Sequence, residues 1–381
     1  MKIVHLCLSC FFIDGRAYQE NELVEEHARQ GHEVLVIAST HVHGDDGKRA
    51  FTRSGNYRDP IGFDIVRLDY HPLLPKTVAK SIRAHKGVYK LIDDFAPDVI
   101  MFHGMCGWEL ITVSHYKRRN PEVLLYVDNH TDFINSARSF FSKWFLHFLF
   151  YRSIVHYCLP NIEKVLSISK PTESFAKSFY DIPPDKLEFF PLGGRPVQDS
   201  EYFTIRERVR RELKLESDHI VFVQSGKQSS SKKLLETLTA FTASIDIRFR
   251  LFIVGSLLSD IREEAEFLIN KDDRITFLGW KRPDQLRELL CAADVYMQPG
   301  SQSSTMQTSL CCYCVPVLSS IDGHEIYTKD NGWIVTDVED IERVLAEISS
   351  GAADLEGKKL ISKKLASEML DYSVLAQRVL R

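Results

Sequence analysis

Two lysines, Lys227 and Lys232, stand where a strand-like run ends and a helix is expected to begin. The run 221–224 is followed by a polar loop, Ser225 to Ser231, which contains one glycine. A helix N-terminus presents free backbone N–H groups and the positive end of the helix dipole, and therefore favours an anion. With two lysines beside it, this segment predicts a site for a phosphate or diphosphate. A solvated polar loop with two surface lysines is the alternative, and the glycine spacing of a Walker loop is absent.

A second polar loop, Gln298 to Thr305, follows the strand-like run Asp294 to Met297. The helix expected over 306–314 begins after Ser304 and Thr305, and such hydroxyl residues cap helices well while leaving backbone N–H groups reachable. An anion fits here too, and simple helix capping is the alternative. Because the carboxyl ends of parallel strands meet at one edge of a sheet, we expect both loops at the same edge.

Short β-branched runs alternate with helix-length amphipathic segments along the chain, which predicts an α/β fold with parallel sheets. Strands are expected at 2–8, 32–37, 98–102, 123–127, 165–167, 187–190, 219–224, 250–254, 275–278, 294–297 and 315–319. The alternation pauses near Pro191 to Pro196 and then restarts, so we predict two doubly wound domains that face each other across a cleft. Their expected bounds are 1–195 and 196–362, and a C-terminal helix at 363–381 is expected to pack back toward the first domain. The polar stretch 41–60 is expected to be a loop.

Length, composition and charge indicate a globular protein of more than one domain. The 381 residues exceed one ordinary domain, and 44% apolar and 26% charged residues are typical of globular proteins. A net charge of −4 offers no overall field that would attract nucleic acid or an anionic membrane. The apolar run Trp144 to Tyr151 is far shorter than the roughly 20 residues that span a bilayer. The chain starts in a strand without a signal-peptide pattern, so a cytoplasmic location is expected.

The eight cysteines lie scattered in apolar runs, which is typical of free thiols in a reducing compartment. Two clusters have the spacing of metal or redox sites, namely Cys7 with Cys10 and the triplet Cys311, Cys312 and Cys314. Core packing is the expected explanation for both clusters, with metal binding or redox chemistry as the alternative.

A set of motifs, in order along nearly the whole chain, resembles glycosyltransferase family 4. The motifs are Met1-Lys2-Ile3-Val4, Gly31-His32-Glu33-Val34, Ser225-Gly226-Lys227 with Lys232, Ile253-Val254-Gly255, Phe277-Leu278-Gly279-Trp280, Ala293-Asp294-Val295, Pro299, Val315-Pro316-Val317 and Asn331-Gly332-Trp333-Ile334-Val335. The resemblance implies a GT-B fold of two Rossmann-like domains, the first for the acceptor and the second for the donor. It also implies a retaining transfer of a sugar from a nucleotide diphosphate, with a UDP-sugar as the expected donor and no metal or other cofactor required. The acceptor would be a hydroxyl of a glycan or glycolipid, as in polysaccharide, capsule or lipopolysaccharide biosynthesis.

The resemblance also assigns roles to single residues of the donor site. Implied contacts are Lys227, Lys232, Gly15, Ser304 and Thr305 for the diphosphate, Trp280, Lys281, Gln307 and Ser309 for the nucleoside, and Ser301, Gln302, Ser303 and Glu325 for the sugar. In the family an arginine and a lysine, five positions apart, grip the diphosphate. Here Lys227 stands in the arginine position, so the charge is kept but the planar two-pronged donor is lost.

The family's pair of glutamates, eight positions apart, is missing. Counting back from Pro316 puts Ser309 and Ser301 at the two positions, whereas counting forward from Pro299 puts Ser303 at the first. Neutral hydroxyl and amide groups bind sugar hydroxyls more weakly than carboxylates do. Either the donor site is rebuilt, or donor affinity is reduced.

In the first half, the loop Asp128 to Asp132 follows a strand. The resemblance implies a histidine near the reacting sugar in this loop, and His130 matches it. His130 would position or polarise the reacting groups, while the leaving phosphate takes the proton of the acceptor hydroxyl. A structural histidine that caps the next helix is the alternative, and His103 is a second candidate.

The aromatic segment Phe140 to Arg152 is expected to be a buried helix, with a helix that rests on a membrane surface as the alternative. The expected partners are a nucleotide sugar and a glycan or lipid-linked glycan acceptor, with a peripheral contact to the inner face of the membrane and no nucleic acid. Two other functions stay open. A non-catalytic GT-B subunit of a glycan-synthesis complex is favoured by the missing glutamates, and a nucleotide-sugar epimerase would need acidic residues that this loop lacks.

Overall fold

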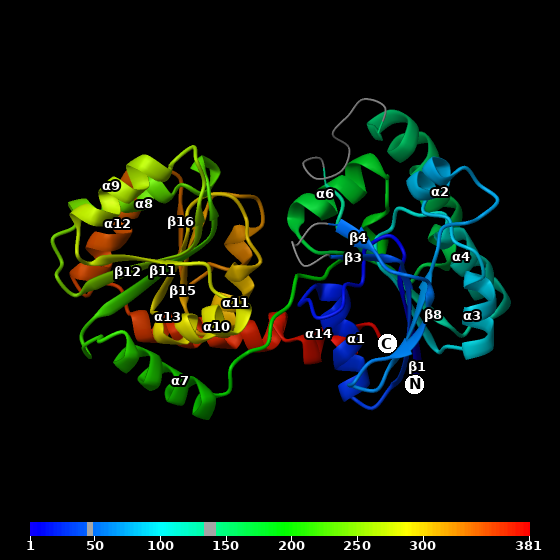
Figure 1. Cartoon of the computed structure of the whole chain (residues 1–381), viewed down its shortest axis with the longest axis horizontal. Helices are drawn as coiled ribbons and strands as arrows, with labels where there is room; N and C mark the ends of the chain where they lie inside the picture. The colour runs from blue at the N-terminus through cyan, green and yellow to red at the C-terminus, as the bar shows by residue number, and fades with distance from the viewer. Residues whose placement is uncertain (44–48, 133–141) are drawn as a thin grey trace. The chain divides into compact units, whose positions relative to one another are not determined.

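The computed structural model of the chain describes residues 1–43, 49–132 and 142–381. It divides into two compact units: unit 1 is Met1–Leu192 with Tyr372–Arg381, and unit 2 is Gly193–Asp371 (Figure 1). The division falls three residues before the predicted one at 195. The segment predicted to return to the first domain, 363–381, is itself divided. Its first part stays in unit 2 because it continues helix α13, which packs on α11, so that only 372–381 joins unit 1.

Unit 1 contains an eight-stranded sheet in the order β10-β9-β8-β7-β1-β2-β6-β5. Its neighbours run parallel, except for the antiparallel pair β5 and β6. The strands are β1 Lys2–Cys7, β2 Glu33–Ser39, β5 Gly55–Arg58, β6 Asp64–Leu68, β7 Val99–Phe102, β8 Leu124–Asn129, β9 Lys164–Ser167 and β10 Leu187–Phe189. A separate hairpin pairs β3 His41–His43 with β4 Arg49–Phe51. The prediction of a loop over 41–60 is therefore wrong: β5 is exposed on both faces, so its sequence lacks the alternation of a half-buried strand.

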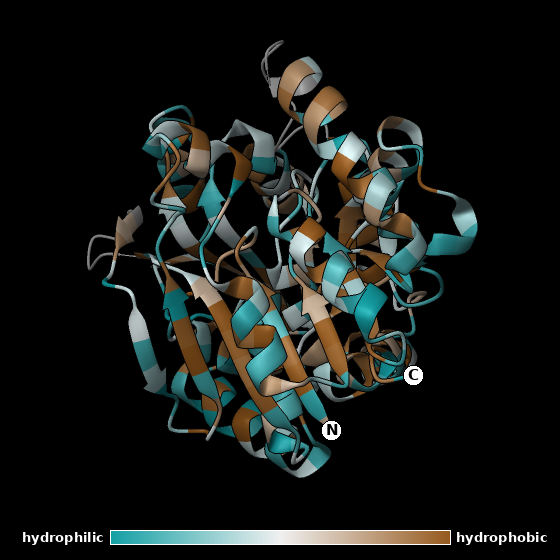
Figure 2. Ribbon diagram, turned by 90° about the vertical axis from the view of Figure 1, so that its right-hand side faces the viewer, coloured by the Kyte–Doolittle hydropathy of each residue, from teal (hydrophilic) through white to brown (hydrophobic). Residues whose placement is uncertain are grey.

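Helices cover both faces of this sheet. They are α1 Gln19–Arg29, α2 Lys76–Ile82, α3 Val88–Phe95, α4 Glu109–Arg119, α5 Arg152–Cys158, α6 Lys170–Phe179 and α14 Tyr372–Arg378, with a π-helix at Ser142–Tyr151 and short 3₁₀ turns at Leu159–Asn161 and Pro184–Lys186. Apolar side chains of α3 to α6 share one core with one side of the strands, and those of α1 and α14 share a second core with the other side. The strands are apolar along most of their length, as the brown bands in Figure 2 show, because a parallel sheet is buried on both faces.

Unit 2 contains a six-stranded, wholly parallel sheet in the order β13-β12-β11-β14-β15-β16. Its strands are β11 Ile220–Gln228, β12 Phe249–Leu257, β13 Ile275–Gly279, β14 Val295–Gln298, β15 Val315–Ser319 and β16 Trp333–Val335. Its helices are α7 Asp199–Glu212, α8 Leu234–Ala243, α9 Arg262–Lys271, α10 Pro283–Ala292, α11 Thr305–Cys311, α12 Val338–Ser349 and α13 Leu355–Leu365, with 3₁₀ turns at Ser230–Lys232 and His324–Ile326 and a π-helix at Ala366–Leu370. The helices of unit 2 form two groups, and the members of each group contact one another. One group is α8, α9 and α12, and the other is α7, α10, α11 and α13 (Figure 1).

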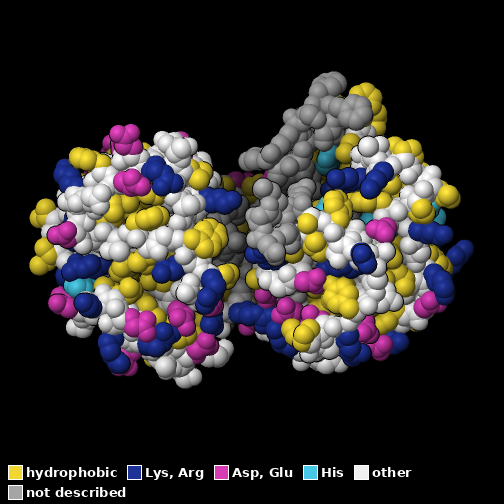
Figure 3. All heavy atoms as spheres, in the orientation of Figure 1, with side chains coloured by type: hydrophobic (Ala, Val, Ile, Leu, Met, Phe, Trp, Pro, Cys, Tyr) yellow, Lys and Arg dark blue, Asp and Glu magenta, His cyan; other side chains and the backbone are white. Residues whose placement is uncertain are grey.

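The π-helix of unit 1 is only half buried. His147 and Tyr151 lie in the core, whereas Trp144, Phe145 and Leu149 are exposed. The prediction of a buried helix is therefore wrong for the face that carries these three side chains. Residues 140 and 141 lie outside the described residues. Among the described residues, no helix combines the length and the apolar character that crossing a membrane requires. Lys and Arg side chains are interspersed with Asp and Glu on the face shown in Figure 3.

Candidate functional site

The strand order of unit 2 reverses between β11 and β14. From β11 the chain builds outward through β12 and β13, and from β14 it builds in the opposite direction through β15 and β16. In open α/β sheets, ligands bind outside the carboxyl ends of the strands at such a reversal. The two polar loops predicted to bind an anion, after β11 and after β14, both begin at this point.

Lys232 joins the two loops. Its Nζ donates to the carbonyl oxygen of Ser301 at 2.6 Å and to that of Gln302 at 3.0 Å. In the other direction, the backbone N–H of Ser301 donates to the carbonyl oxygen of Ser231 at 2.8 Å. The loops therefore form one surface with an ammonium group at its centre. Burial lowers the pKa of Lys232, so an anion at this surface would stabilise its charged form.

The backbone around the lysines differs from the prediction. β11 extends through Lys227 to Gln228, so Lys227 lies exposed at the end of a strand instead of in a loop. The strand continues because Gly226 and Gly255, both with positive φ, lie opposite each other in β11 and β12. α8 begins at Leu234, two residues later than predicted, because a 3₁₀ turn and a left-handed Lys233 come first.

Gly300 allows the second loop to lie directly on the first. A Cβ atom at this position would lie 2.6 Å from the carbonyl carbon of Lys232 and 2.7 Å from its Cα, and closer still to the carbonyl oxygen of Ser231. These are backbone atoms, so no side-chain rotation can relieve the overlap. A glycine is therefore required at this contact.

We expect Gly300→Ala to separate the two loops. The overlap should destabilise unit 2 by about 1–3 kcal/mol, which is the usual cost of overpacking, and thermal unfolding measures it. Gly55→Ala is the matched control, because a Cβ atom at Gly55 meets nothing within 4 Å. Equal stability of the two variants would contradict the close approach described here.

Two of the residues expected to contact the nucleoside lie in the interior of unit 2. Gln307 and Ser309 are buried in α11, and the Ser309 hydroxyl donates to the carbonyl oxygen of Met306 at 2.7 Å. The position matched to the second family glutamate is therefore buried in this structure, and the nucleoside contacts assigned to Gln307 and Ser309 stay a prediction. The physical reason for this burial is that α11 is buried on nearly all sides. Trp280, by contrast, is 68% exposed directly after β13, and Lys281 beside it is partly exposed.

The expected sugar and phosphate contacts of the second loop are accessible. Gln302 and Ser304 are exposed, and Ser301, Ser303 and Thr305 are partly exposed. Ser304 occupies the N-cap position without capping; instead the Ser303 hydroxyl accepts a hydrogen bond from the backbone N–H of Thr305 at 3.3 Å. After β15, Glu325 is exposed, and its carboxylate accepts from the backbone N–H of Gly323 at 2.9 Å.

Buried polar side chains support these loops from below, and the sequence analysis missed them. Gln224 in β11 donates to the carbonyl oxygen of Lys232 at 3.1 Å, and the Tyr296 hydroxyl lies 3.2 Å from that of Ser225. Gln228 and Gln298 are buried at the ends of β11 and β14. Glutamines inside otherwise apolar parallel strands were the available signal, because a buried amide needs polar partners.

In unit 1 the strand order reverses between β1 and β7, and the loop after β8 carries His130. The buried carboxylate of Asp128 holds this site together: one oxygen lies 2.5 Å from His103 Nδ1, and the other accepts from the backbone N–H of Gly104 at 2.6 Å. His130 Nε2 lies 3.4 Å from Asp128 and 3.9 Å from Glu20. His130 and His103, the two predicted candidates, thus share one carboxylate.

Electrostatics favour a charged His130. Burial opposes the charge, but the carboxylates of Asp128 and Glu20 outweigh it and raise the pKa of His130 to about 9. Burial likewise opposes ionisation of Asp128, yet His103 and His130 hold the pKa of that carboxyl far below its usual value. At neutral pH the site therefore contains an imidazolium and a carboxylate.

The raised pKa predicts a stability change with pH. A group whose pKa rises on folding stabilises the fold fully below its unfolded pKa of about 6.5, and this contribution is lost as the pH rises through about 9. The side chain is 22% exposed, and we expect a loss of about 2–3 kcal/mol over this range. Urea unfolding at the two limits should show that His130→Gln lacks this change. An equal pH dependence in the wild type and the variant would contradict the assignment.

The loop with Gly15 is fixed by an arginine that the sequence analysis did not single out. Arg67 is 2% exposed, and it donates to the carbonyl oxygen of Ser39 at 2.8 Å and to the Asp14 carboxylate at 2.9 Å. The Tyr57 hydroxyl donates to the same carboxylate at 2.8 Å. Gly15 itself is exposed with a φ of +68°. An arginine at an inward position of β6 was the available signal.

Among the described residues, two groups bring three possible metal ligands together: Cys10 with Asp128 and His130, and Glu216 with Asp218 and His219. The first group lies in the His130 site. Burial, Glu20 and Asp128 raise the pKa of Cys10 well above its usual value, so this thiol is neutral, and the charged His130 has no free nitrogen lone pair; this group therefore does not fit a cation. Sequence spacing did not indicate this group, because Cys10 and His130 are far apart in the chain. A metal-free reaction stays a prediction.

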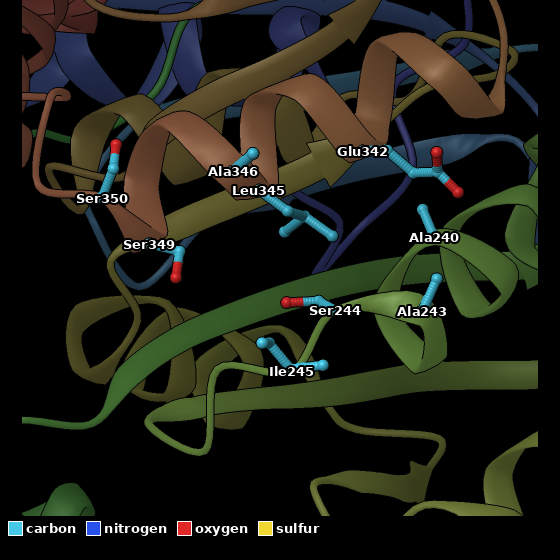
Figure 4. A pocket seen from close by; sticks show the side chains of 9 residues that line it. All are labelled: Ala240, Ala243, Ser244, Ile245, Glu342, Leu345, Ala346, Ser349 and Ser350. Atoms are coloured by element: carbon cyan, nitrogen blue, oxygen red, sulfur yellow. The ribbon is translucent and has the colours of Figure 1, made fainter.

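A pocket of about 440 Å³ lies between the C-terminal ends of α8 and α12 (Figure 4). It is lined by Ala240, Ala243, Ser244, Ile245, Glu342, Leu345, Ala346, Ser349 and Ser350. This lining contains no lysine or arginine, and the pocket is at the opposite end of α8 from Lys232. It therefore lacks the charge that a diphosphate requires.

Comparison with known proteins matches each half of the chain to a glycosyltransferase domain. Residues 21–193 match the model of Glycosyltransferase Family 4, and residues 217–351 match that of Glycosyl transferases group 1. No curated protein matches the chain. The first matched range lies in unit 1, except for its last residue, Gly193, and the second range lies in unit 2.

Solved structures share the fold at low identity. Anabaena HepE in complex with UDP is 14% identical with a TM-score of 0.65, and the match covers 100% of this chain and 98% of that one. Sucrose-phosphate synthase from Thermosynechococcus elongatus is 16% identical with a TM-score of 0.62, covering 99% and 97%. WaaG, a glycosyltransferase involved in lipopolysaccharide biosynthesis, is 15% identical with a TM-score of 0.60, covering 99% and 98%. With two parallel-sheet units and a family match in each, the chain is a GT-B glycosyltransferase with a family 4 domain followed by a group 1 domain.

Proposed function

We propose that the protein transfers a sugar from a nucleotide diphosphate sugar, with a UDP-sugar as the preferred donor, to a hydroxyl of a glycan or glycolipid with retention of configuration. The observation that carries the donor proposal is Lys232, whose ammonium group lies between two loops at the strand-order reversal of unit 2. The structures of HepE in complex with UDP and with UDP-glucose support a uridine donor. The involvement of WaaG in lipopolysaccharide biosynthesis supports a glycan acceptor.

In the proposed reaction, Lys227 and Lys232 neutralise the negative charge that develops on the leaving diphosphate as the sugar–phosphate bond breaks. The leaving phosphate oxygen takes the proton of the acceptor hydroxyl, so the protein needs no separate strong base. For the charged His130 of unit 1 we propose the role that the family resemblance assigns to it, which is to position or polarise the reacting groups. No metal is required in this scheme, because lysines supply the positive charge.

The test is thermal unfolding in the presence of uridine, guanosine, adenosine and thymidine diphosphates and their sugars. A ligand that binds only the folded state raises the melting temperature by mass action. We expect one nucleotide series to raise it, and Lys227→Ala and Lys232→Ala to reduce or remove the increase. No increase with any nucleotide at millimolar concentration would overturn the donor site.

A non-catalytic GT-B subunit is the second candidate function. It is favoured by the absence of acidic residues between Asp294 and Asp322, where the family carries its glutamates. Release of free nucleotide from the donor in the presence of acceptor extracts distinguishes the two. Nucleotide binding without any release would favour the subunit.

We also propose that the acceptor is lipid-linked and is met at the inner face of a membrane. The exposed side chains of Trp144, Phe145 and Leu149 on one face of the π-helix support this contact, because exposed aromatic residues settle at a lipid interface. Sedimentation with anionic vesicles tests it, and Trp144→Ser with Phe145→Ser should reduce binding. Absence of sedimentation would overturn the membrane contact and leave a soluble glycan as the acceptor.

A further inference from the structure

Three buried histidines form a continuous line of hydrogen bonds in unit 1, which we call the histidine file: His103, His5 and His27. His103 Nε2 lies 2.9 Å from His5 Nδ1, and His5 Nε2 lies 2.9 Å from His27 Nδ1. All three side chains are fully buried, and they come from the end of β7, from β1 and from α1. The file therefore crosses the interior of unit 1 without contact to solvent.

Both ends of the histidine file meet groups that accept hydrogen bonds. At one end, His103 Nδ1 lies 2.5 Å from the Asp128 carboxylate. At the other end, His27 Nε2 lies 3.0 Å from the carbonyl oxygen of Ala376 in α14. A carbonyl oxygen and an ionised carboxylate accept hydrogen bonds but cannot donate them.

The acceptors at both ends fix how many protons the ring nitrogens of the histidine file must carry. The line has four hydrogen bonds and therefore needs four protons, whereas three neutral imidazoles bring one N–H each. Because His27 must donate to Ala376, its Nδ1 accepts from His5, and His5 Nδ1 in turn accepts from His103. A neutral His103 would then face the carboxylate with a bare Nδ1, two acceptors 2.5 Å apart. The line therefore contains one proton more than three neutral rings supply.

The extra proton belongs on His103. Asp128 accepts from the backbone N–H of Gly104 at 2.6 Å and lies 3.4 Å from His130, and both contacts favour the ionised carboxylate. Burial lowers the pKa of His27 to about 4, and burial together with the neighbouring histidines lowers that of His5 well below its usual value.

The groups around the file do not change this assignment. His32 lies edge-on to the His27 ring at 5.9 Å and does not contact the Asp128 end. Near the carboxylate, Glu20 faces His130, and the thiols of buried Cys7 and partly buried Cys10 are neutral, because burial and the carboxylates of Glu20 and Asp128 raise their pKa. An imidazolium on His103 beside ionised Asp128 is neutral as a pair, which makes its burial tolerable.

We propose that His103, His5 and His27 are positioning residues that hold one buried imidazolium, on His103, against Asp128, and that the Ala376 carbonyl fixes the direction of the whole file. The imidazolium keeps the carboxylate ionised and turned so that its second oxygen faces His130. The Ala376 carbonyl belongs to α14, which follows unit 2 in the chain. Packing of this last helix on unit 1 therefore sets the protonation of His103 and, through Asp128, the surroundings of His130. The role of this device in sugar transfer rests on the proposed function, but the buried imidazolium itself does not.

Nuclear magnetic resonance of the full chain labelled with ¹⁵N-histidine tests the proposal. At about pH 8.5, roughly two units above the ordinary histidine pKa of about 6.5, surface histidines are neutral. We expect two imidazolium signals, from His130 and His103, identified by their loss in His130→Gln and His103→Gln. His5 and His27 should give neutral rings protonated on Nε2. Neutral signals from all three file residues in the wild type would overturn the proposal.

Two substitutions at His27 give a matched comparison far along the line from Asp128. In His27→Gln the amide NH₂ can donate to Ala376 and the amide oxygen can accept from His5, so the His103 imidazolium should remain. In His27→Leu the His5 Nε2–H has no acceptor, so the direction of the file can reverse, and the two remaining neutral rings, His5 and His103, then satisfy Asp128. We expect the imidazolium signal to be lost there. Equal spectra of the two variants would contradict the fixed direction.

A purely structural role for these histidines would lower stability in both variants without this difference. If His27→Leu does not fold, the wild-type and His27→Gln spectra still decide whether the imidazolium exists. The nucleotide-dependent change in melting temperature is measured on the same samples. Failure of the donor site in unit 2 would leave the histidine signals unchanged, so failure of the proposed function and failure of this inference are distinguishable.

Discussion

Replacing Lys232 by alanine is expected to remove most of the nucleotide-induced increase in melting temperature. The ammonium group lies between the loops after β11 and β14, where it donates to the carbonyl oxygens of Ser301 and Gln302. A charge-assisted hydrogen bond to a phosphate contributes about 1.5–3 kcal/mol. Its loss should therefore weaken nucleotide binding by about 10-fold to 150-fold.

Lys233→Ala is the matched control for this experiment. Lys233 is the neighbouring residue, and its Nζ also donates to a carbonyl oxygen, that of Thr336 at 2.6 Å. Both substitutions remove one positive charge from the same turn, but only Lys232 lies between the two loops. We expect Lys233→Ala to retain nucleotide binding within a few-fold. Equal losses in the two variants would show that the overall charge of the turn attracts the nucleotide and would contradict a specific role for Lys232.

Nucleotide titration of Lys232→Ala should also separate direct binding from loop structure. The substitution removes two hydrogen bonds to backbone carbonyls, so some loss of stability without ligand is expected, about 1 kcal/mol. Gly300→Ala separates the same loops but keeps both lysines. A binding loss in Lys232→Ala much larger than in Gly300→Ala would assign the effect to the ammonium group itself.

The fold was predictable because it depends on local patterns. Buried parallel strands such as β1 and β11 are apolar runs of the right length, and the helices between them are amphipathic. The exposed strand β5 was missed because it lacks a buried face that would impose an apolar pattern, and β3 and β4 were missed because strands of three residues are too short to show one. The division of the C-terminal segment was missed for another reason: the sequence shows one helical region, and tertiary contacts alone decide where it leaves unit 2.

The candidate site was predictable only where it is contiguous in sequence. The loops with Lys232 and with Ser301 to Thr305 were found because lysines and hydroxyl residues follow apolar runs. The buried state of Ser309 was missed, because counting positions from a motif does not show which face of a helix is covered. His130 and His103 were predicted singly, but the sequence did not show that Asp128 joins them, because His103 and Asp128 come from the ends of different strands. The line of His103, His5 and His27 was missed for the same reason, since His5 and His103 are 98 positions apart.

Both units hold a functional loop in place with a buried polar side chain, but this side chain is an amide in unit 2 and a carboxylate in unit 1. In each, a loop that follows a parallel strand contacts a buried polar side chain beneath it, namely Gln224 under Lys232 in unit 2 and Asp128 under His130 in unit 1. A neutral amide suffices below the first loop because it holds a backbone carbonyl. A carboxylate is needed below the second because it faces imidazole rings.

Asp128→Asn is expected to produce the largest change in unit 1. The carboxylate accepts from Gly104 N–H and faces His103 and His130, so its neutralisation leaves buried positive charge without a partner. Removing one member of a buried ion pair costs about 3–5 kcal/mol. The pKa of His130 should fall at the same time, because Asp128 is the main group that raises it. The stability change between about pH 6.5 and 9 should therefore disappear in urea unfolding.

Asp294→Asn provides the control in unit 2. Asp294 is also buried, accepts from the backbone N–H of Val221 at 2.8 Å, and pairs with Arg206 and Lys359, each at 2.6 Å. Its neutralisation should cost a similar free energy of unfolding, but it does not touch His130, so the pH dependence should persist. If Asp128→Asn kept that pH dependence, Glu20 rather than Asp128 would be the carboxylate that charges His130. The comparison thus separates the general cost of an unpaired buried charge from the specific control of one histidine by one carboxylate.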